Sequence, residues 1–109
     1  FVVADRKTNV CLGTCGAYTP PDWPENEIGW WLHPDARGRG LATEAAIAVR
    51  TFLYRFGWHT AVSYIHPTNQ ASKSVARRLG AKLEKIEPIR GEDHEVWRHP
   101  SPEYLGIAA

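Results

Sequence analysis

Two arginines and two glycines stand together at Arg37-Gly38-Arg39-Gly40, directly before an apolar segment with helical periodicity. A glycine-rich turn that opens a helix presents backbone N–H groups that have no acceptor inside the helix, and the helix dipole adds positive potential at that end. The two guanidinium groups add further positive charge. This spacing predicts a binding loop for a phosphate or pyrophosphate group.

Two common nucleotide-binding loops do not fit this stretch. A Walker loop requires a lysine after its last glycine, and Leu41 follows Gly40 instead. The dinucleotide motif Gly-x-Gly-x-x-Gly fails at its third glycine, where Thr43 stands. It also requires an acidic residue about 20 positions further on, at the end of the next strand, and that strand ends in His66-Pro67.

The phosphate loop is flanked by a predicted strand and a predicted helix. Residues 27–32 are aromatic and β-branched, and the turn residues 33–35 end that strand. A helix is predicted over residues 41–56, where Gly57 ends it. Its apolar stripe contains Leu41, Ala45, Ala48, Val49, Phe52, Leu53 and Phe56. The helix leads to a strand at residues 60–65, and a helical crossover makes the two strands parallel.

Neighbouring parallel strands can splay apart at their carboxyl ends, and the opening between them suits an extended phosphate-bearing ligand. A second helix is predicted over residues 70–79, with Asn69 as its N-cap and Gly80 at its end. Strands are further predicted at 1–4, 10–18, 81–87 and 94–98, and the tail from Pro100 is expected to be loosely attached. The 109 residues therefore predict one α/β (α+β) domain with a mixed, mostly antiparallel sheet, a splayed parallel pair and flanking helices.

Two motifs resemble the GCN5-related N-acetyltransferase superfamily. Its acetyl-CoA loop reads Gln/Arg-x-x-Gly-x-Gly/Ala, and residues 37–42 match every fixed position. The second motif is Asn69-x-x-Ser72-x-x-Val75-x-x-x-Leu79-Gly80, about 30 residues later. The runs at 27–32 and 42–45 are similar to the branch that acetylates ribosomal-protein N-termini. The resemblance extends to about residue 100, and the strand and two helices that normally open this fold have no counterpart, so we expect an N-terminally truncated domain.

The resemblance implies a set of residues that bind acetyl-CoA. Backbone N–H groups of the loop would bind the pyrophosphate: Arg37, Gly38, Arg39, Gly40, Leu41 and Ala42. The backbone of Trp31, Leu32 and His33 would pair with the pantetheine. Asn69 would lie against the pantetheine arm, a role that is compatible with capping the second helix.

Acetyl transfer to an amine also needs a base and a proton source for the leaving thiolate. Glu27 opens the central strand near the place where relatives carry a catalytic carboxylate, and we expect it to be the general base. Many relatives carry a tyrosine acid where Ala76 stands, so Ser72 is the candidate partner of the thiolate. His33 is a further candidate, because it ends one of the two parallel strands as His66 ends the other, and either imidazole could titrate near neutrality.

Composition limits the partners. The formal net charge of +1 gives no strong attraction to nucleic acid or to a membrane surface, and no apolar run approaches the ~20 residues of a membrane span. Cys11 and Cys15 are expected to be reduced, which favours a cytoplasmic location. No Cys/His spacing indicates a metal site.

A domain without its opening strand would have a free sheet edge, so we expect a homodimer.

The resemblance implies an N-acetyltransferase that moves the acetyl group of acetyl-CoA to a primary amine by direct attack. The amine could be a protein N-terminus or a small molecule. An alternative is an acyl-CoA-binding module without turnover, which the substitution at Ala76 favours. An RNA-binding domain would need a basic face that a chain of net charge +1 scarcely provides.

Overall fold

The structure is a computed structural model that describes residues 1–108. Six strands form one sheet in the order β1-β2-β3-β4-β6-β5. The elements in chain order are β1 (Val2–Ala4), β2 (Cys11–Tyr18), β3 (Glu27–Leu32), the 3-10 helix η1 (Pro34–Ala36), α1 (Leu41–Phe56), β4 (Val62–Ile65), α2 (Gln70–Arg78), β5 (Lys82–Ile89), β6 (Glu92–Arg98) and α3 (Pro102–Leu105).

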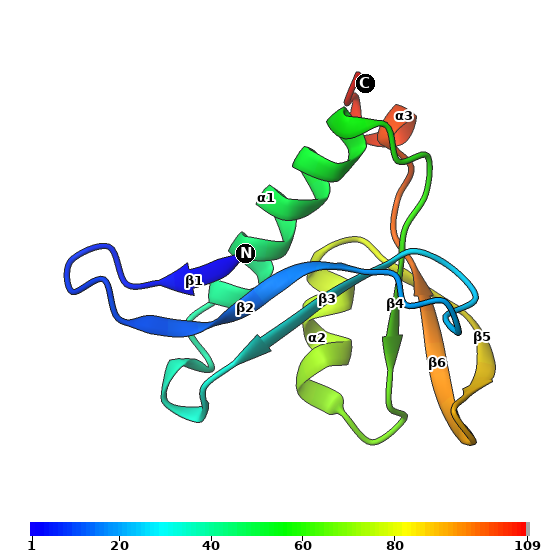
Figure 1. The fold of residues 1–109 in the computed structure, drawn as a ribbon, viewed down its shortest axis with the longest axis horizontal. Coiled ribbons are helices and arrows are strands. Elements are labelled where there is room, and N and C mark those ends of the chain that lie inside the picture. The colour runs from blue at the N-terminus through cyan, green and yellow to red at the C-terminus, as the bar shows by residue number, and fades with distance from the viewer. Residues whose placement is uncertain (109) are drawn as a thin grey trace.

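The centre of the sheet is a parallel pair that separates almost at once. Among residues 1–108, β3 and β4 are parallel and register only at Glu27 and Val62, whereas the other strand pairs are antiparallel. In Figure 1 the two arrows start close together and diverge toward their heads. This confirms the predicted fold class, a mostly antiparallel sheet with one splayed parallel pair.

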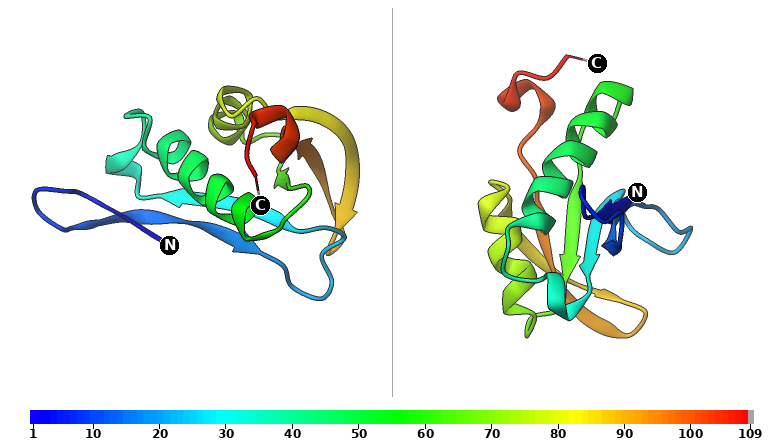
Figure 2. Two further views of the ribbon diagram at one scale, coloured as in Figure 1. Left: turned by 90° about the horizontal axis from the view of Figure 1, so that it is seen from above. Right: turned by 90° about the vertical axis from the view of Figure 1, so that its left-hand side faces the viewer.

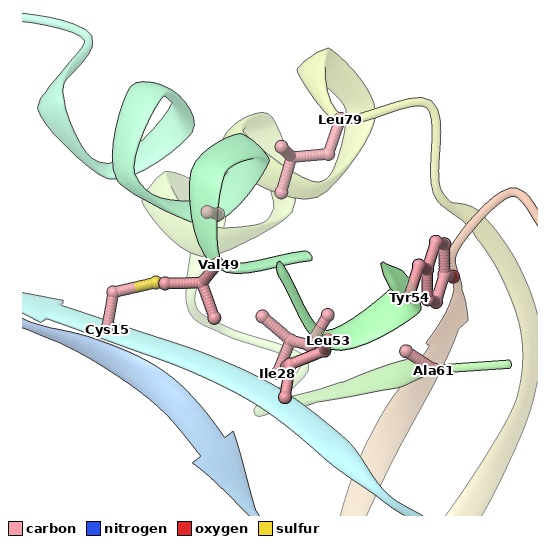
Figure 3. Packing of buried hydrophobic residues seen from close by; sticks show 8 residues of the cluster. Cys15, Ile28, Val49, Leu53, Tyr54, Ala61 and Leu79 are labelled. Atoms are coloured by element: carbon pink, nitrogen blue, oxygen red, sulfur yellow. The ribbon is translucent and has the colours of Figure 1, made fainter. Parts of the chain in front are cut away.

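Helix α1 holds the sheet together from one face. Its buried residues include Val49 and Leu53, which form one core cluster with Ile28 of β3 and Cys15 of β2. Figure 3 shows Leu53 against Ile28 and the sulfur of Cys15 beside Val49. Burial raises the pKa of the Cys15 thiol to about 11, so this cysteine is a protonated core residue.

The apolar stripe that periodicity predicts for α1 is only partly buried. Phe52 and Phe56 are 52% and 77% exposed, and their rings stack on each other at 6.2 Å. Arg50 of the same helix, in contrast, is buried, with 6% of its surface exposed. Periodicity therefore placed two of the largest side chains on the wrong side of the helix, because it locates apolar residues without showing which of them the sheet covers.

Both long helices lie on the same face of the sheet. Figure 2 shows α1 and α2 side by side above the strands, and the described residues place no helix on the opposite face. Residues 28 and 30 of β3 face these helices, so the alternation of a strand turns Glu27 and Gly29 toward the other face. No helix within residues 1–108 is long and apolar enough to cross a bilayer.

The C-terminal tail is attached, contrary to the expectation of a loose segment. Ser101 caps α3 by accepting a hydrogen bond from the Tyr104 N–H at 3.1 Å, and Pro102 is buried. The hydroxyl of Tyr54 donates to the carbonyl of Pro100 at 2.7 Å, which ties α1 to the tail. Ile107 packs against the main core cluster. Residue 109 lies outside the described part of the chain.

Candidate active site

The opening between β3 and β4 is made by two side chains that replace ladder hydrogen bonds. The Val62 N–H donates to the Asn26 carbonyl at 3.2 Å, so a continued parallel ladder would pair the Tyr64 N–H with the Ile28 carbonyl. Instead, the Tyr64 N–H donates to Oε2 of Glu27 at 2.7 Å.

The second replacement is made from the other strand. The Ile28 carbonyl accepts a hydrogen bond from the Ser63 hydroxyl at 2.6 Å. Both groups that would have continued the ladder are thereby satisfied by side chains. The strands separate without leaving a buried polar backbone group unpaired at this point, which would otherwise cost free energy.

The divergence leaves a backbone donor of β3 facing the opening. The N–H of His33 bonds to the Leu12 carbonyl of β2, and the register between β2 and β3 runs without a bulge. Backbone groups of an extended strand alternate from side to side, so residues 29 and 31 face β2 while Trp30 faces β4. The Trp30 N–H therefore lies where β4 has already turned away. A donor in that place can polarise a carbonyl bound in the opening.

The phosphate loop, residues 37–42, joins η1 to the first turn of α1. Gly38 and Gly40 have φ angles of +79° and +73°, a conformation that glycine adopts without a side-chain penalty. Gly40 is also the N-cap of α1. Its carbonyl accepts the first hydrogen bond of the helix, from the Glu44 N–H at 3.1 Å. Within the described residues, no backbone carbonyl accepts from the N–H groups of residues 38–43. These groups are available to an anion at a helix N-terminus.

A cavity of about 350 Å³, called the larger cavity below, lies between this loop, β3 and α2. Thr43 carries a buried hydroxyl that has no hydrogen-bond partner, and its residue lines the cavity. An orphaned hydroxyl beside free N–H groups fits a ligand that brings acceptor oxygens, as a pyrophosphate does. The lining residues are Trp30, Trp31, Leu32, Arg37, Gly38, Gly40, Leu41, Ala42, Thr43, Asn69, Ala71, Ser72, Ser74, Val75 and Arg78.

Most residues expected to bind acetyl-CoA line this larger cavity, and His33 and Arg39 do not. The imidazole of His33 is exposed and lies edge-on to the Trp31 ring, 4.7 Å between centroids. Asn69 caps α2 by accepting from the Ser72 N–H at 3.1 Å, so the capping role is present while the residue also lines the cavity.

Two basic residues of α2 contact β6, and one lines the larger cavity. Lys73 pairs with the buried Glu95 at 3.0 Å, and the Arg77 guanidinium lies over the Trp97 ring at 5.4 Å. Both side chains are therefore engaged with β6. Arg78 lines the larger cavity and is the basic residue of this helix that is placed to meet a phosphate.

A smaller cavity of about 160 Å³ occupies the opening itself. It shares Trp30, Asn69 and Ser72 with the larger cavity, so the two meet at these residues. A ligand that extends from the phosphate loop along β3 reaches this meeting point. The lining residues are Glu27, Ile28, Gly29, Trp30, Ser63, Tyr64, Ile65, His66, Asn69 and Ser72.

Glu27 brings a buried carboxylate to the smaller cavity. The residue is only 8% exposed, and burial raises its pKa above the ordinary value. Two donated hydrogen bonds, from the Trp23 indole at 2.8 Å and from the Tyr64 N–H, together with the charge of His94, oppose that rise in pKa. A carboxylate that is desolvated yet held in place can accept a proton at a defined position.

His66 reaches the smaller cavity, whereas His33 lines neither cavity. The expectation that both histidines face one opening is thus met by one of them. Nδ1 of His66 lies 2.8 Å from the Thr68 hydroxyl, and its ring is 6.2 Å from the ring of His94. Among residues 1–108, no group of three or more His, Cys, Asp or Glu side chains is arranged to hold a metal ion.

Ala76 faces the core instead of the cavities. It is fully buried in a cluster with Ile65, Ala81 and Trp97. This position therefore supplies no proton donor, and Ser72 is the hydroxyl residue that lines both cavities.

Sequence reasoning missed three residues of this region. Thr43 was considered as the position where a dinucleotide motif fails and as part of the run at 42–45, but not as a binding residue. The third residue of a helix is nevertheless a place where a side chain can join an anion site. Ser63 and Tyr64 were treated as strand residues. Their roles depend on Ile28 and Glu27, which are 35 and 37 positions away, so no local pattern could reveal them.

Comparison with known proteins shows which family has this fold. Residues 1–82 match the acetyltransferase (GNAT) domain family. An acetyltransferase from Agrobacterium tumefaciens is similar in structure, with a TM-score of 0.78 and 38% sequence identity over 87% of this chain and 56% of that protein. The Mycobacterium smegmatis RimJ protein, solved in complex with CoA-disulfide, has a TM-score of 0.64 and 25% identity over 73% of this chain and 41% of that protein.

A structure of lower sequence identity shares the fold. The ribosomal-protein-S5-alanine acetyltransferase from Vibrio fischeri has a TM-score of 0.77 and 21% identity, over 94% of this chain and 61% of that protein. The chain thus spans less than two thirds of the length of each of these three proteins.

Proposed function

The chain belongs to the GNAT acetyltransferase family, and we propose that it transfers the acetyl group of acetyl-CoA to a primary amine by direct attack. The observation that carries this proposal is the meeting of the two cavities at Trp30, Asn69 and Ser72. One cavity begins at a loop of free backbone N–H groups, and the other contains a buried carboxylate. A thioester at the meeting point would lie between an anchored phosphate and a base.

In this proposal, acetyl-CoA binds along the larger cavity. Its pyrophosphate accepts hydrogen bonds from the N–H groups of residues 38–43, with Arg37 and Arg78 adding charge. The Thr43 hydroxyl gains the partner that it lacks in the chain alone. The pantetheine then follows the Trp31–Leu32 segment of β3 toward the opening.

The chemical step uses groups around the opening. The neutral amine attacks the thioester carbon, and the Trp30 N–H stabilises the oxygen as negative charge develops on it. Glu27 accepts the proton that the attacking nitrogen loses, directly or through water. The carbon–sulfur bond breaks, and the CoA thiolate leaves and takes up a proton from solvent. Ser72 is placed to hydrogen-bond this thiolate, because its residue lines both cavities.

The acceptor is a primary amine, either a protein N-terminus or a small molecule. The buried carboxylate of Glu27 and the absence of lysine and arginine from the residues that line the smaller cavity favour a group that arrives as an ammonium ion. The imidazole of His66 lines the smaller cavity, and the ring of His94 lies 6.2 Å from it. His33 stays a weaker candidate for catalysis because it lines neither cavity.

The alternative is a module that binds acyl-CoA without turnover, and the alanine at position 76 favours it, because it supplies no proton donor. A thiol-release assay with acetyl-CoA and a mixture of primary amines separates the two. An acetyltransferase releases free CoA in proportion to added amine. A binding module retains acetyl-CoA in calorimetry and releases no thiol above the rate without amine, and that result would contradict the proposal.

The catalytic assignment has its own test. Glu27→Gln should lower the rate by about 10²–10⁴-fold with acetyl-CoA affinity little changed, because general base catalysis contributes about that factor. The acidic limb of the pH–rate profile should disappear in the variant. A wild-type rate and profile would move the base role to His66 or to solvent.

We also propose that the chain forms a homodimer. Strand β1 is an edge of the sheet, and Phe1 beside it is 67% exposed and lies 5.7 Å from the Phe52 ring. An unpaired strand edge next to exposed aromatic rings can be covered by the same surface of a second copy.

A further inference from the structure

The Glu27 carboxylate has a donor at each oxygen. Nε1 of Trp23 donates to Oε1 at 2.8 Å, and the backbone N–H of Tyr64 donates to Oε2 at 2.7 Å. Hydrogen bonds to the charged form of a carboxylate stabilise that form, and a pair of donors also fixes the plane of the group. The Tyr64 donor belongs to a strand, whereas the Trp23 donor comes from the loop of residues 19–26.

This loop tryptophan is held from several sides. Its ring contacts Tyr18 edge-on at 5.4 Å and Tyr64 edge-on at 6.2 Å. The Arg90 guanidinium lies over the ring at 4.5 Å. Aromatic and cation–π contacts of this kind prefer defined orientations. Together they set the direction in which the indole N–H points.

Arg90 is itself tied back to the loop. Its Nε and NH2 groups donate to the two carboxylate oxygens of Asp22 at 2.6 and 3.0 Å. Arg90 stands at the turn between β5 and β6 with a φ of +51°, so a strained turn residue carries the contact. Both partners are more than half exposed, and an exposed ion pair contributes little to stability. Its evident effect is to hold the Trp23 loop against the β5–β6 turn.

We propose that Trp23 is a positioning residue for the general base Glu27, and that the Asp22–Arg90 pair holds Trp23 in place. This inference rests on the proposed function of Glu27. The indole N–H occupies one side of the carboxylate and the strand N–H the other, so the remaining lone pairs face the smaller cavity in a fixed direction. A loop that is not part of the acetyl-CoA site thus sets the geometry of proton transfer.

Other groups also influence the charge of Glu27. Tyr18 is its neighbour on β2, Tyr64 lies on β4 and His94 on β6. The carboxylates of Glu25 and Asp22 and the guanidinium of Arg90 come from the loop and the turn. The positive charge of a protonated His94 lowers the pKa of Glu27 in the same direction as the Trp23 hydrogen bond does. A test must therefore separate these two contributions.

Trp23→Phe removes the indole N–H and keeps an aromatic ring in the loop. The variant should raise the pKa of Glu27 by about one unit. The reason is that the lost hydrogen bond stabilises the charged carboxylate by a free energy of about that size. NMR titration of ¹³C-labelled glutamate side chains reads this pKa without any need for turnover. The acidic limb of the pH–rate profile should move to higher pH by the same amount. His94→Gln in both backgrounds separates the contribution of the imidazole.

Trp58→Phe is the matched control, because Trp58 packs against the main core and lines neither cavity. It should leave the Glu27 titration and the acidic limb unchanged. Asp22→Asn should shift the limb in the same direction as Trp23→Phe and by less. Thermal unfolding of each variant establishes that the protein compared is folded.

Glu27→Gln distinguishes this inference from the proposed function. A glutamine has one acceptor oxygen, so its NH₂ group must face either Trp23 or the Tyr64 N–H. The double variant Trp23→Phe/Glu27→Gln removes that conflict and should stay as slow as Glu27→Gln alone. If Glu27→Gln abolishes the limb but Trp23→Phe leaves both limb and pKa unchanged, Trp23 is not a positioning residue. If Glu27→Gln keeps the wild-type profile, the base assignment itself is wrong. An unchanged Asp22→Asn limb would remove the ion pair from the inference.

Discussion

Nε2 of His99 lies 2.8 Å from the hydroxyl oxygen of Ser63, and both residues are buried. The Ser63 hydroxyl donates to the Ile28 carbonyl, so the imidazole must supply the proton in the contact with Ser63. The other nitrogen, Nδ1, lies 3.1 Å from a guanidinium nitrogen of Arg50 and accepts from it. One chain of hydrogen bonds therefore connects α1 to the point where β3 and β4 separate.

The first prediction concerns the stability supplied at this point. Ser63→Ala leaves the Ile28 carbonyl and the His99 N–H without their partner in a buried place. The free energy of unfolding should fall by about 1–3 kcal/mol, the usual cost of an unsatisfied buried polar group. Urea unfolding measures it. Tyr54→Phe is the comparison, since it removes a hydroxyl that bonds the Pro100 carbonyl at a distance from the opening. A Ser63→Ala protein of unchanged stability would show that the replacement of the ladder bond is energetically unimportant.

The second prediction is a pH dependence of stability that originates at His99. Burial, followed by the charges of Arg50 and Arg98, lowers the pKa of this imidazole from 6.5 to about 3. Below pH 6.5 the unfolded chain binds a proton at this residue that the folded chain does not bind. The stabilisation from the neutral imidazole is therefore complete above that pH and is lost as the pH falls, by about 1.4 kcal/mol per pH unit.

His99→Gln isolates this contribution, because the carboxylates titrate alike in both proteins. Urea unfolding at several pH values should give a steeper loss of stability on acidification for the wild type than for His99→Gln. Parallel curves would mean that His99 is protonated in the folded protein, and its Nδ1 could then not accept the hydrogen bond from Arg50.

Local patterns predicted the elements around the site. The bounds of β3 and α1 agree with the sequence expectation, because Pro34, Gly40 and Gly57 mark where these elements end or begin. The phosphate loop was predicted for the same reason: its glycines and the helix start are adjacent in the chain. The short helix α3 was missed although Ser101-Pro102 is a helix-start signal, since its prolines and polar residues resemble a loose tail.

Contacts between distant residues could not be predicted in this way. An arginine in an amphipathic helix is normally assigned to the solvent side, yet Arg50 is buried because it donates to the Leu79 carbonyl at 2.7 Å and to His99. The splay of the parallel strands was expected in general. Its cause, the exchange of ladder bonds for Glu27 and Ser63 side chains, depends on pairs more than 30 positions apart.

The third prediction concerns self-association. Double substitution of Phe52 and Phe56 by serine removes exposed aromatic area beside the β1 edge and should lower the apparent mass in light scattering at high protein concentration. Tyr104→Ser is the control, since this residue is 76% exposed on α3. A wild-type protein that remains a monomer at high concentration would contradict the proposed homodimer.

The last prediction tests the phosphate loop. Gly40→Val places a side chain where no protein atom lies within 4 Å, so the chain itself has room for it and only an approaching ligand would be blocked. The φ of +73° still penalises valine, by about 1–3 kcal/mol. Gly106→Val is a matched control, because Gly106 has a φ of +71° and open space around it and lies at the end of α3.

Both variants should lose similar stability on unfolding, whereas Gly40→Val alone should lose affinity for CoA. Isothermal calorimetry should show at least about tenfold weaker binding, since several charge-assisted hydrogen bonds to the pyrophosphate depend on close approach to the backbone. The binding should also weaken with added salt in the wild type, as expected for a phosphate contact that is partly exposed. Unchanged affinity in Gly40→Val would place the pyrophosphate elsewhere, and equal losses in both variants would attribute the effect to folding.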